Sequence, residues 1–332
     1  MISHRARVAV TMGDPAGIGP EILLKSLARP EIFEFCVPVV YGNVAALERS
    51  MKLAGANLKV RAIDDPAGAR GETGVVDVIE PEPLDFSAFG VGEGNAATGA
   101  FSAGCFGAAI KDGLKAKTDA VIMGPASKQA QNEGGYKFAG FRETANHFTG
   151  VDDTVLITLG DTYNLARVTT HVPLSEVPGL CSRENVLAVI RQSDAGMRSI
   201  GYAKPRIGVS ALNPHCGEGG LLGREEIEAI GPAIEDARAD GIEASGPYPG
   251  DTVFLNMKAG EFDLIISMFH DHGNACIKLA EFGTLVNLLA GAPIPILTVH
   301  HGTAFNIAGR GTADETNLVC AFYTAAGRQA PH

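Results

Sequence analysis

"VAVTMGDPAGIGPEILLKSL", residues 8–27, reads as a buried strand, a glycine-rich turn and a helix. Proline at the first helical position and glutamate in the first turn are typical of a helix start, so we expect the helix to open at Pro20 and Glu21. The glycine spacing matches neither GxGxxG nor GxxxxGK[ST]. The turn is therefore either a tight connection or a cradle for a ligand.

Similar short apolar runs recur between segments of helical periodicity. Most are continuous rather than alternating, which is typical of strands covered on both faces by helices. The predicted strands are 7–12, 37–42, 120–125, 154–160, 166–171, 206–212, 263–269 and 295–299, and the clearest predicted helices are 101–116, 183–200 and 224–241. This pattern predicts an α/β fold with parallel or mixed sheets, and 332 residues favour two domains.

Composition excludes several classes of partner. The formal net charge is -11 and no run of lysine or arginine occurs, so we expect neither nucleic acid nor an anionic membrane as partner. The longest apolar stretch, 286–299, contains two prolines and is too short to span a bilayer, and the first residues do not resemble a signal peptide. Six scattered cysteines indicate reduced thiols, and hence a cytoplasmic protein.

Three histidines end three predicted strands: His171, His215 and His270. In α/β sheets the carboxyl edge is where ligands bind, so we expect one shared site. Three imidazoles with an open position are typical of a catalytic divalent metal. Zn²⁺ suits nitrogen ligands best; Co²⁺, Ni²⁺ and Mn²⁺ are alternatives, and Mg²⁺ would prefer oxygen.

Two aspartates lie close to these histidines in the sequence. Asp271 follows His270 directly, and Asp251 follows the turn "GPYPG". Both are candidates to orient a metal-bound imidazole or a water molecule. A solvated loop acid or a helix cap is the alternative for each. His272 and His301 are weaker candidates for the same site.

Five motifs spread over the whole chain, "TMGDPAGIGPEI", "TTHVPL", "LNPHCGEGG", "MFHDHG" and "HGTAFNIAGRGTAD", resemble the family of 4-hydroxythreonine-4-phosphate dehydrogenase, an enzyme of pyridoxal phosphate biosynthesis. The resemblance implies the fold of isocitrate and isopropylmalate dehydrogenases, with two α/β domains, a central cleft and a homodimer. It implies that three histidines shared between subunits bind a divalent metal, and these match His171, His215 and His270. It also implies NAD(P)⁺-linked oxidation of a hydroxyl β to a carboxylate, followed by loss of CO₂.

On this basis we expect a first domain of residues 1–128 with 290–332, and a second domain of residues 129–289 that carries the metal-binding histidines. The resemblance does not identify the residues that contact the cofactor, nor whether it is NAD or NADP.

The substrate contacts of the family carry over unevenly. Lys278 and Asn287 match a lysine and an asparagine that contact substrate, and Lys278 would also assist proton transfer. "GFRE" replaces the family's "GHTE", so Phe141 and Arg142 stand where a His-Thr pair is expected, and Ile296 replaces an arginine of the anion pocket. Phe141 packing on a flat ring and Arg142 pairing with a carboxylate would suit a different ligand; a core phenylalanine and a surface arginine are the alternative.

These departures lead us to expect an unphosphorylated cis-dihydrodiol carboxylate as substrate, as for the family's terephthalate 1,2-cis-dihydrodiol dehydrogenase branch of aromatic catabolism. The biosynthetic phosphate ester is the alternative. A metal-dependent hydrolase, which needs no nicotinamide, and a catalytically silent metal-binding relative are alternatives of another class.

Overall fold

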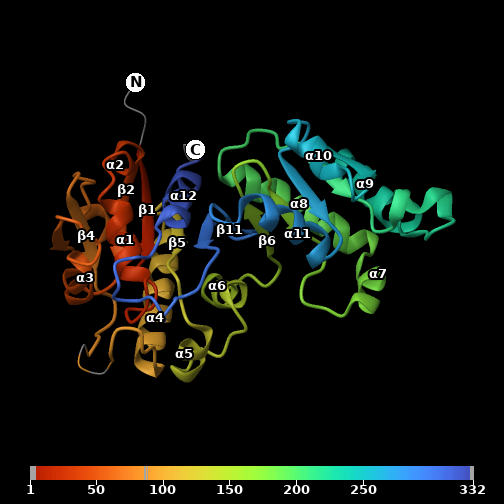
Figure 1. The fold of residues 1–332 in the computed structure, drawn as a ribbon. Coiled ribbons are helices and arrows are strands. Elements are labelled where there is room, and N and C mark those ends of the chain that lie inside the picture. The colour runs from red at the N-terminus through yellow and green to blue at the C-terminus, as the bar shows by residue number, and fades with distance from the viewer. Residues whose placement is uncertain (1–4, 86, 88, 330–332) are drawn as a thin grey trace. The chain divides into compact units, whose positions relative to one another are not determined.

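The computed structural model describes residues 5–85, 87 and 89–329. The chain divides into two compact units: unit 1 runs up to Asp152 and resumes at Ala292, and unit 2 spans Asp153–Gly291. Strands and helices alternate within each unit (Figure 1). The predicted α/β fold class is therefore confirmed.

Unit 1 is built on a sheet with the strand order β3-β4-β2-β1-β5-β12. Neighbouring strands in this order pair in parallel. Its elements are β1 (Ala6–Thr11), α1 (Gly19–Leu27), α2 (Ile32–Phe35), β2 (Cys36–Tyr41), α3 (Val44–Met51), β3 (Lys59–Ala62), the 3₁₀-helix η1 (Pro66–Gly68), β4 (Val75–Ile79), α4 (Ala96–Leu114), β5 (Ala120–Met123), α5 (Lys128–Glu133), α6 (Phe141–Thr149), β12 (Ile296–Val299) and α12 (Thr316–Ala325).

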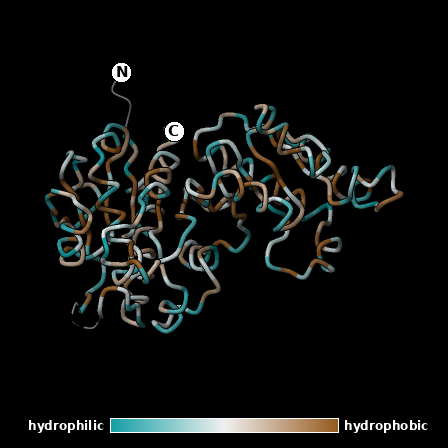
Figure 2. The backbone as a smooth tube through the Cα atoms, viewed as in Figure 1, coloured by the Kyte–Doolittle hydropathy of each residue, from teal (hydrophilic) through white to brown (hydrophobic). Residues whose placement is uncertain are grey.

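The central strands of unit 1 explain the continuous apolar runs in the sequence. Every residue of β2, β5 and β12 is buried, so both faces of the sheet are covered there. Helices α4 and α12 pack against these strands. Hydrophobic residues accordingly concentrate along the strands (Figure 2).

Residues 129–152, which the sequence analysis assigns to the second domain, pack in unit 1. A Cβ atom at Gly99 of α4 would lie 2.0 Å from the backbone carbon of Ala130, so α5 sits directly on α4. The Phe106 ring of α4 lies 6.0 Å from the Phe141 ring of α6. These contacts shift the division of the chain from the predicted 128/129 to Asp152/Asp153.

Unit 2 is built on a mixed sheet with the order β11-β6-β7-β10-β8-β9. Strands β11, β6 and β7 pair antiparallel, whereas β7, β10, β8 and β9 pair in parallel. Its elements are β6 (Val155–Leu159), β7 (Leu165–Arg167), η3 (Leu174–Glu176), α7 (Val177–Leu180), α8 (Arg183–Ser199), β8 (Ile207–Ser210), η4 (Pro214–Gly220), η5 (Glu226–Ile230), α9 (Gly231–Ala239), β9 (Ala244–Tyr248), α10 (Val253–Lys258), β10 (Leu264–Ser267), α11 (His270–Glu281) and β11 (Val286–Ala290).

A compact apolar cluster anchors elements of unit 2 that flank the candidate site residues. It joins β7, β10, α10 and α11, and its buried members are Leu165, Val253, Phe254, Met257, Phe262, Ile265, Ile277 and Leu285. Burying such side chains contributes about 1.5 to 3 kcal/mol each. Helix α11 is thus held against the sheet at Ile277, which fixes the direction of its first turn.

In the glycine-rich turn between β1 and α1, backbone segments approach one another closely. Gly13 has a φ of +73°, and a Cβ atom there would lie 2.2 Å from the carbonyl oxygen of Pro125. At Gly19 a Cβ atom would lie 1.9 Å from the carbonyl oxygen of Met12. Residues 12–20 are all buried. Of the two alternatives for this turn, the geometry fits the tight connection.

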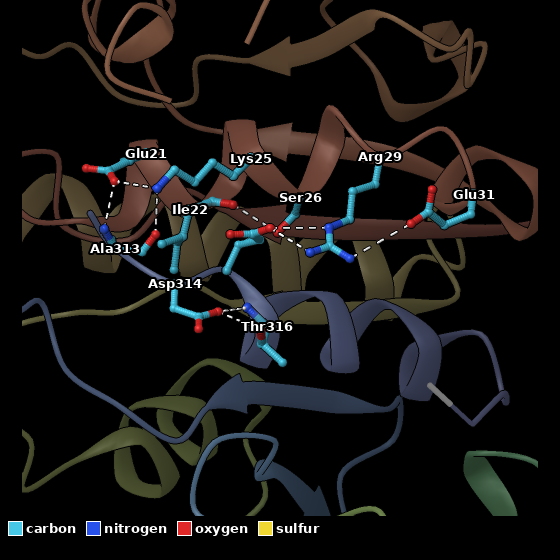
Figure 3. Close-up of polar contacts among 10 residues, drawn as sticks. Glu21, Ile22, Lys25, Ser26, Arg29, Glu31, Ala313, Asp314 and Thr316 are labelled. Carbon is cyan, nitrogen blue, oxygen red and sulfur yellow. Dashed lines mark hydrogen bonds and ion pairs between the residues drawn. The ribbon is translucent and has the colours of Figure 1, made fainter. Parts of the chain in front are cut away.

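Helix α1 also fixes the segment that follows β12. Glu21 accepts hydrogen bonds from Lys25 and from the backbone N–H of Ala313, both at 2.9 Å (Figure 3). Lys25 donates in turn to the carbonyl oxygens of Gly311, at 3.0 Å, and Ala313, at 2.6 Å. The motif 301–314 is therefore anchored to the start of the chain by a largely buried ion pair.

Candidate active site

The three predicted histidines follow three neighbouring strands of unit 2. Strands β7, β10 and β8 are adjacent and parallel, so their carboxyl ends meet at one edge of the sheet. His171 lies shortly after β7, His270 opens α11 after β10, and His215 lies in η4 after β8. The sequence prediction placed them at strand ends; the structure places each one in the connection just beyond.

Two of these histidines lie together. The rings of His171 and His270 have centroids 5.5 Å apart. His270 Nδ1 lies 2.9 Å from Asp271 Oδ1, so the carboxylate orients the imidazole and leaves Nε2 on the opposite side of the ring. Two imidazoles on one metal, with bonds of about 2.1 Å, have centroids roughly 5 Å apart. The donor set of this pair therefore fits a divalent ion that prefers nitrogen.

His215 sits in a turn of unusual backbone geometry. His215, Cys216 and Glu218 have φ values of 52°, 53° and 47°, a region that non-glycine residues rarely adopt. Residues held this way cost about 1 to 3 kcal/mol each and cluster at functional sites. The side chain of His215 is exposed.

A buried carboxylate holds this turn, and the sequence analysis did not identify it. Glu226 of η5 is 4% exposed. Its Oε1 accepts the backbone N–H groups of Leu212 and Asn213, at 2.9 and 2.7 Å. Its Oε2 accepts from the side-chain amide of Asn213 at 3.0 Å. Glu226 thus fixes the two residues that precede Pro214 and His215. A glutamate in an amphipathic helical run carries no signal of such a role.

The structure does not bring His215 to the other two histidines. Within residues 5–85, 87 and 89–329, no three side chains of histidine, cysteine, aspartate or glutamate are arranged to hold a metal ion. Within one chain the predicted site is thus divided into two separate parts, the His171–His270 pair and the turn that carries His215.

Asp251 lies near His272. Burial lowers the pKa of His272, and a hydrogen bond with the backbone of Gly250 and the negative charge of Asp251 offset part of that effect. The His272 ring stacks on Phe269, with centroids 5.2 Å apart. His272 thus has the surroundings of a packed histidine. His301 is partly buried, and its Nδ1 lies 3.0 Å from the carbonyl oxygen of Gly302.

Lys278 and Asn287 occupy different environments in unit 2. Lys278 is exposed on α11, two turns beyond His270. Asn287 of β11 is 9% exposed, and its Oδ1 accepts a hydrogen bond from the Thr158 hydroxyl at 3.0 Å. A buried arginine, Arg167, donates to the same hydroxyl at 2.9 Å. No sequence pattern indicates its role, because Arg167 lies in a run that is typical of an ordinary strand.

Phe141 and Arg142 belong to unit 1. Phe141 packs on the buried ring of Phe106, and Arg142 is exposed with its Nε 3.3 Å from Glu143. Both side chains fit the alternative of a packed phenylalanine and a surface arginine. Ile296 is fully buried in β12, where an apolar side chain is expected.

These features define a class of protein: an α/β enzyme that carries imidazoles and a lysine beyond the carboxyl ends of parallel strands, where such folds bind ligands. Residues 34–325 match the family "Pyridoxal phosphate biosynthetic protein PdxA". The chain belongs to this family.

Known relatives cover nearly the whole chain. The D-threonate 4-phosphate dehydrogenase of Cupriavidus necator is 38% identical, over 94% of each chain. The crystal structure of a 4-hydroxythreonine-4-phosphate dehydrogenase from Burkholderia phymatum is similar with a TM-score of 0.90 and 34% identity, covering 99% of this chain and 100% of that one. A terephthalate 1,2-cis-dihydrodiol dehydrogenase from Burkholderia xenovorans gives a TM-score of 0.75 and 28% identity, covering 99% and 100%.

The protein is therefore an oxidoreductase that acts on a CH–OH group, as predicted. This conclusion removes the support for the hydrolase alternative. Among the helices that the structure describes, none is both long and apolar enough to cross a bilayer.

Proposed function

We propose that this protein oxidises the hydroxyl group β to the carboxylate of a four-carbon acid phosphorylated at C4, with NAD⁺ or NADP⁺ as oxidant, and that the β-keto acid then loses CO₂. The substrate we propose first is 4-hydroxythreonine-4-phosphate. The observation that carries the proposal is the His171–His270 pair, 5.5 Å between centroids, at the carboxyl edge of parallel strands in a chain of this family.

The chain carries residues that would form a metal site suited to this reaction. His171, His215 and His270 would hold a divalent ion, with Zn²⁺ as the first choice for three nitrogen donors. A divalent ion held there would supply Lewis-acid chemistry, by acidifying a hydroxyl group and stabilising negative charge on oxygen. Asp271 fixes the ring of His270 in one orientation through the 2.9 Å contact with Nδ1.

Other residues of unit 2 would bind and orient the acid. Lys278 has an exposed ammonium group, which can pair with a carboxylate or phosphate and return a proton to the carbon that loses CO₂. Asn287 would donate from its amide to an anionic oxygen. Asp251 would act on the proton of the reacting hydroxyl, directly or through water.

The comparisons favour the phosphorylated substrate over the unphosphorylated diol that the sequence analysis put first. The terephthalate 1,2-cis-dihydrodiol dehydrogenase is the more distant relative, at 28% identity and a TM-score of 0.75, against 34% and 0.90 for the 4-hydroxythreonine-4-phosphate dehydrogenase. The packing of Phe141 on Phe106 also gives this side chain a role without a ligand ring.

D-threonate 4-phosphate is a second candidate, which a specific observation favours. The "GFRE" sequence and Ile296 depart from the pattern of the biosynthetic enzyme, and a relative at 38% identity is called a D-threonate 4-phosphate dehydrogenase. Threonate carries a hydroxyl group where hydroxythreonine carries an ammonium group. Different contacts at that carbon would explain why "GFRE" and Ile296 depart from the pattern of the biosynthetic enzyme. The chain still aligns over 94% of its length with the D-threonate 4-phosphate dehydrogenase.

We also propose that the protein acts as a cytoplasmic homodimer, with His215 of one subunit completing the metal site of the other. Leu221, Leu222 and Ile227, on the segment that follows His215, are 80%, 46% and 48% exposed. Exposed apolar side chains grouped on one segment are typical of an interface between subunits. A shared site accounts for the separation of His215 from the other two histidines.

The test is NAD(P)⁺ reduction by the purified protein with Zn²⁺ or Co²⁺ and three substrates in parallel: 4-hydroxythreonine-4-phosphate, D-threonate 4-phosphate and the cis-dihydrodiol of terephthalate. We expect turnover with one or both phosphorylated acids. Turnover with the diol alone would contradict the proposal and restore the aromatic-pathway substrate.

A further inference from the structure

Arg167, in β7, is a buried cation without a carboxylate partner among the described residues. It is 6% exposed. Its Nη1 donates to Asn274 Oδ1 at 2.5 Å, and its Nη2 donates to the Thr158 hydroxyl at 2.9 Å and to the carbonyl oxygen of Leu156 at 3.3 Å. Burial lowers the pKa of Arg167 to about 10, so it remains charged at neutral pH. All of its hydrogen-bond acceptors are neutral.

Stability alone gives no reason for this arrangement. Removing a charge from water costs several kcal/mol, and a buried ion is often replaced by apolar residues of similar volume without loss of stability. The Nε atom of Arg167 has no acceptor within the described part of the chain, which adds to that cost. A buried charge that is this poorly compensated points to a role other than folding.

The hydrogen bonds of Arg167 run in one direction only. A guanidinium group donates and never accepts. The Thr158 hydroxyl accepts from Arg167 and therefore directs its own proton onward, to Asn287 Oδ1 at 3.0 Å. The oxygen of the Asn287 amide thus faces the interior, which fixes the opposite end of the amide as Nδ2, a group with two N–H donors.

The same arginine holds a second element that carries site residues. Asn274 lies one turn after His270 in α11, the helix that also carries Asp271 and Lys278. Because Asn274 accepts from Arg167 through Oδ1, the first turns of α11 are tied to β7, the strand that leads to His171. One buried charge therefore joins β6, β7, β11 and α11.

We propose that Arg167 is a positioning residue for recognition of an anionic substrate. Through Thr158 it locks the Asn287 amide in the orientation that presents N–H donors to a carboxylate or phosphate oxygen, and through Asn274 it ties down the turn of α11 that carries His270. The inference rests on the proposed function, because it requires Asn287 to contact the substrate.

The experiment compares variants in one kinetic assay with the phosphorylated acid that the wild type oxidises. Arg167→Met removes the charge and keeps the volume. Thr158→Val removes the hydroxyl group and keeps the shape, whereas Thr158→Ser keeps the hydroxyl group. Arg191→Met, which loses an exposed arginine of α8, is the matched control.

We expect Arg167→Met to fold with a lower unfolding temperature, because the buried acceptors of Asn274 and Leu156 lose their donor. It should raise KM for the acid about 10- to 100-fold, the usual cost of losing a residue that orients a ligand-binding group. KM for the nicotinamide should change little. Thr158→Val should raise KM for the acid in the same way, and Thr158→Ser should restore it. In an Asn287→Ala background, Thr158→Val should cause no further rise, because Thr158 acts on substrate through Asn287.

An Arg167→Met variant with unchanged KM would overturn the inference, as would a Thr158→Val effect that persists without Asn287. If the wild type oxidises none of the acids, the proposed function fails, and binding of inorganic phosphate then decides the inference separately. Phosphate binding weakened by Arg167→Met and Thr158→Val but not by Thr158→Ser upholds it; equal binding by all variants overturns it.

Discussion

Two glycine-rich turns follow strands in this protein, and they serve different ends. The turn after β1 in unit 1 is buried throughout, and its glycines let backbone segments approach closely. The turn after β8 in unit 2 is largely exposed and places His215, Cys216 and Glu218 at positive φ, where glycine would be favoured. Strain at non-glycine residues is a feature that clusters at functional sites, so the turn after β8 is the stronger candidate of the two for a ligand site.

A buried carboxylate stabilises each turn by accepting backbone N–H groups. Asp14 accepts from Ala16 at 3.0 Å and from the Thr98 hydroxyl at 3.1 Å, and burial raises the pKa of Asp14. Glu226 accepts from two backbone N–H groups ahead of His215. The device is shared, but only the second turn holds an exposed imidazole. If the two turns differ in this way, changes in the turn of unit 1 should lower the free energy of unfolding. Changes at the site of unit 2 should lower metal binding and activity.

The largest effect should come from the site. His270→Ala removes one of the two imidazoles that lie together, and a lost metal costs several kcal/mol of transition-state stabilisation. At 1.36 kcal/mol per tenfold, we expect activity to fall about 10³-fold or more, with metal binding lost and the unfolding temperature of the apoprotein unchanged. Metal analysis, turnover and thermal unfolding of the variant measure these three effects.

His147→Ala is the matched control, because it removes an exposed imidazole of α6 that packs beside Phe138. It should keep both metal and activity. A chelator should reduce the wild type to the level of His270→Ala, and added Zn²⁺ should rescue only the wild type. Full activity in His270→Ala would remove this histidine from the site.

The strands show how much of the fold could be predicted from the sequence. Continuous apolar runs identified the buried strands, such as β2, β5 and β10, because both of their faces are covered. Strand β3, with exposed and half-buried residues, and β9, with glycine and proline inside it, have no such run and were missed. Strands β4 and β11 were missed too, although most of their residues are buried. The helix predicted over 183–200 is α8, whose cap Ser182 accepts the N–H of Asn185 at 3.2 Å.

The second prediction concerns the closed turn in unit 1. Gly13→Ala forces a side chain into a φ of +73° and brings Cβ to 2.2 Å from the carbonyl oxygen of Pro125, so the backbone must shift. We expect a loss of about 3 kcal/mol in the free energy of unfolding, from about 1 to 2 kcal/mol for the dihedral and the rest for the clash. Denaturant unfolding measures it.

Gly55→Ala separates the two causes. Gly55 has a similar φ of +61° but nothing within 4 Å of the added Cβ atom, so this variant should lose only about 1 kcal/mol. Metal binding, assigned to unit 2, should survive in both variants. Equal losses in the two variants would show that the β1–α1 turn is not held by close backbone approach.

The candidate site was predictable where residue type and position coincide. Histidines beyond parallel strands indicate a ligand site from chemistry alone, which is why His171, His215 and His270 could be grouped before the fold was known. Within one chain the structure brings only His171 and His270 together. Glu226 and Arg167 could not be found in this way. Their roles depend on which atoms they face after folding, and a glutamate in a helix or an arginine in a strand is ordinary in sequence.

The smallest effect should come from Glu226→Gln, which tests whether the strained turn is held in place for its histidine. One end of the glutamine amide would still accept, but the other would present N–H groups where Leu212, Asn213 or the Asn213 amide already donates. A residue that orients a metal ligand typically costs 10- to 100-fold in metal affinity when changed, so we expect a loss of about 10-fold. Titration with Zn²⁺ measures it.

Glu228→Gln is the control. It changes an exposed residue of the same segment that pairs with Arg224, and it should leave the affinity unchanged. If Glu226→Gln lowers only the unfolding temperature, its carboxylate serves the fold of unit 2, as Asp14 serves that of unit 1, and the contrast between the two turns fails.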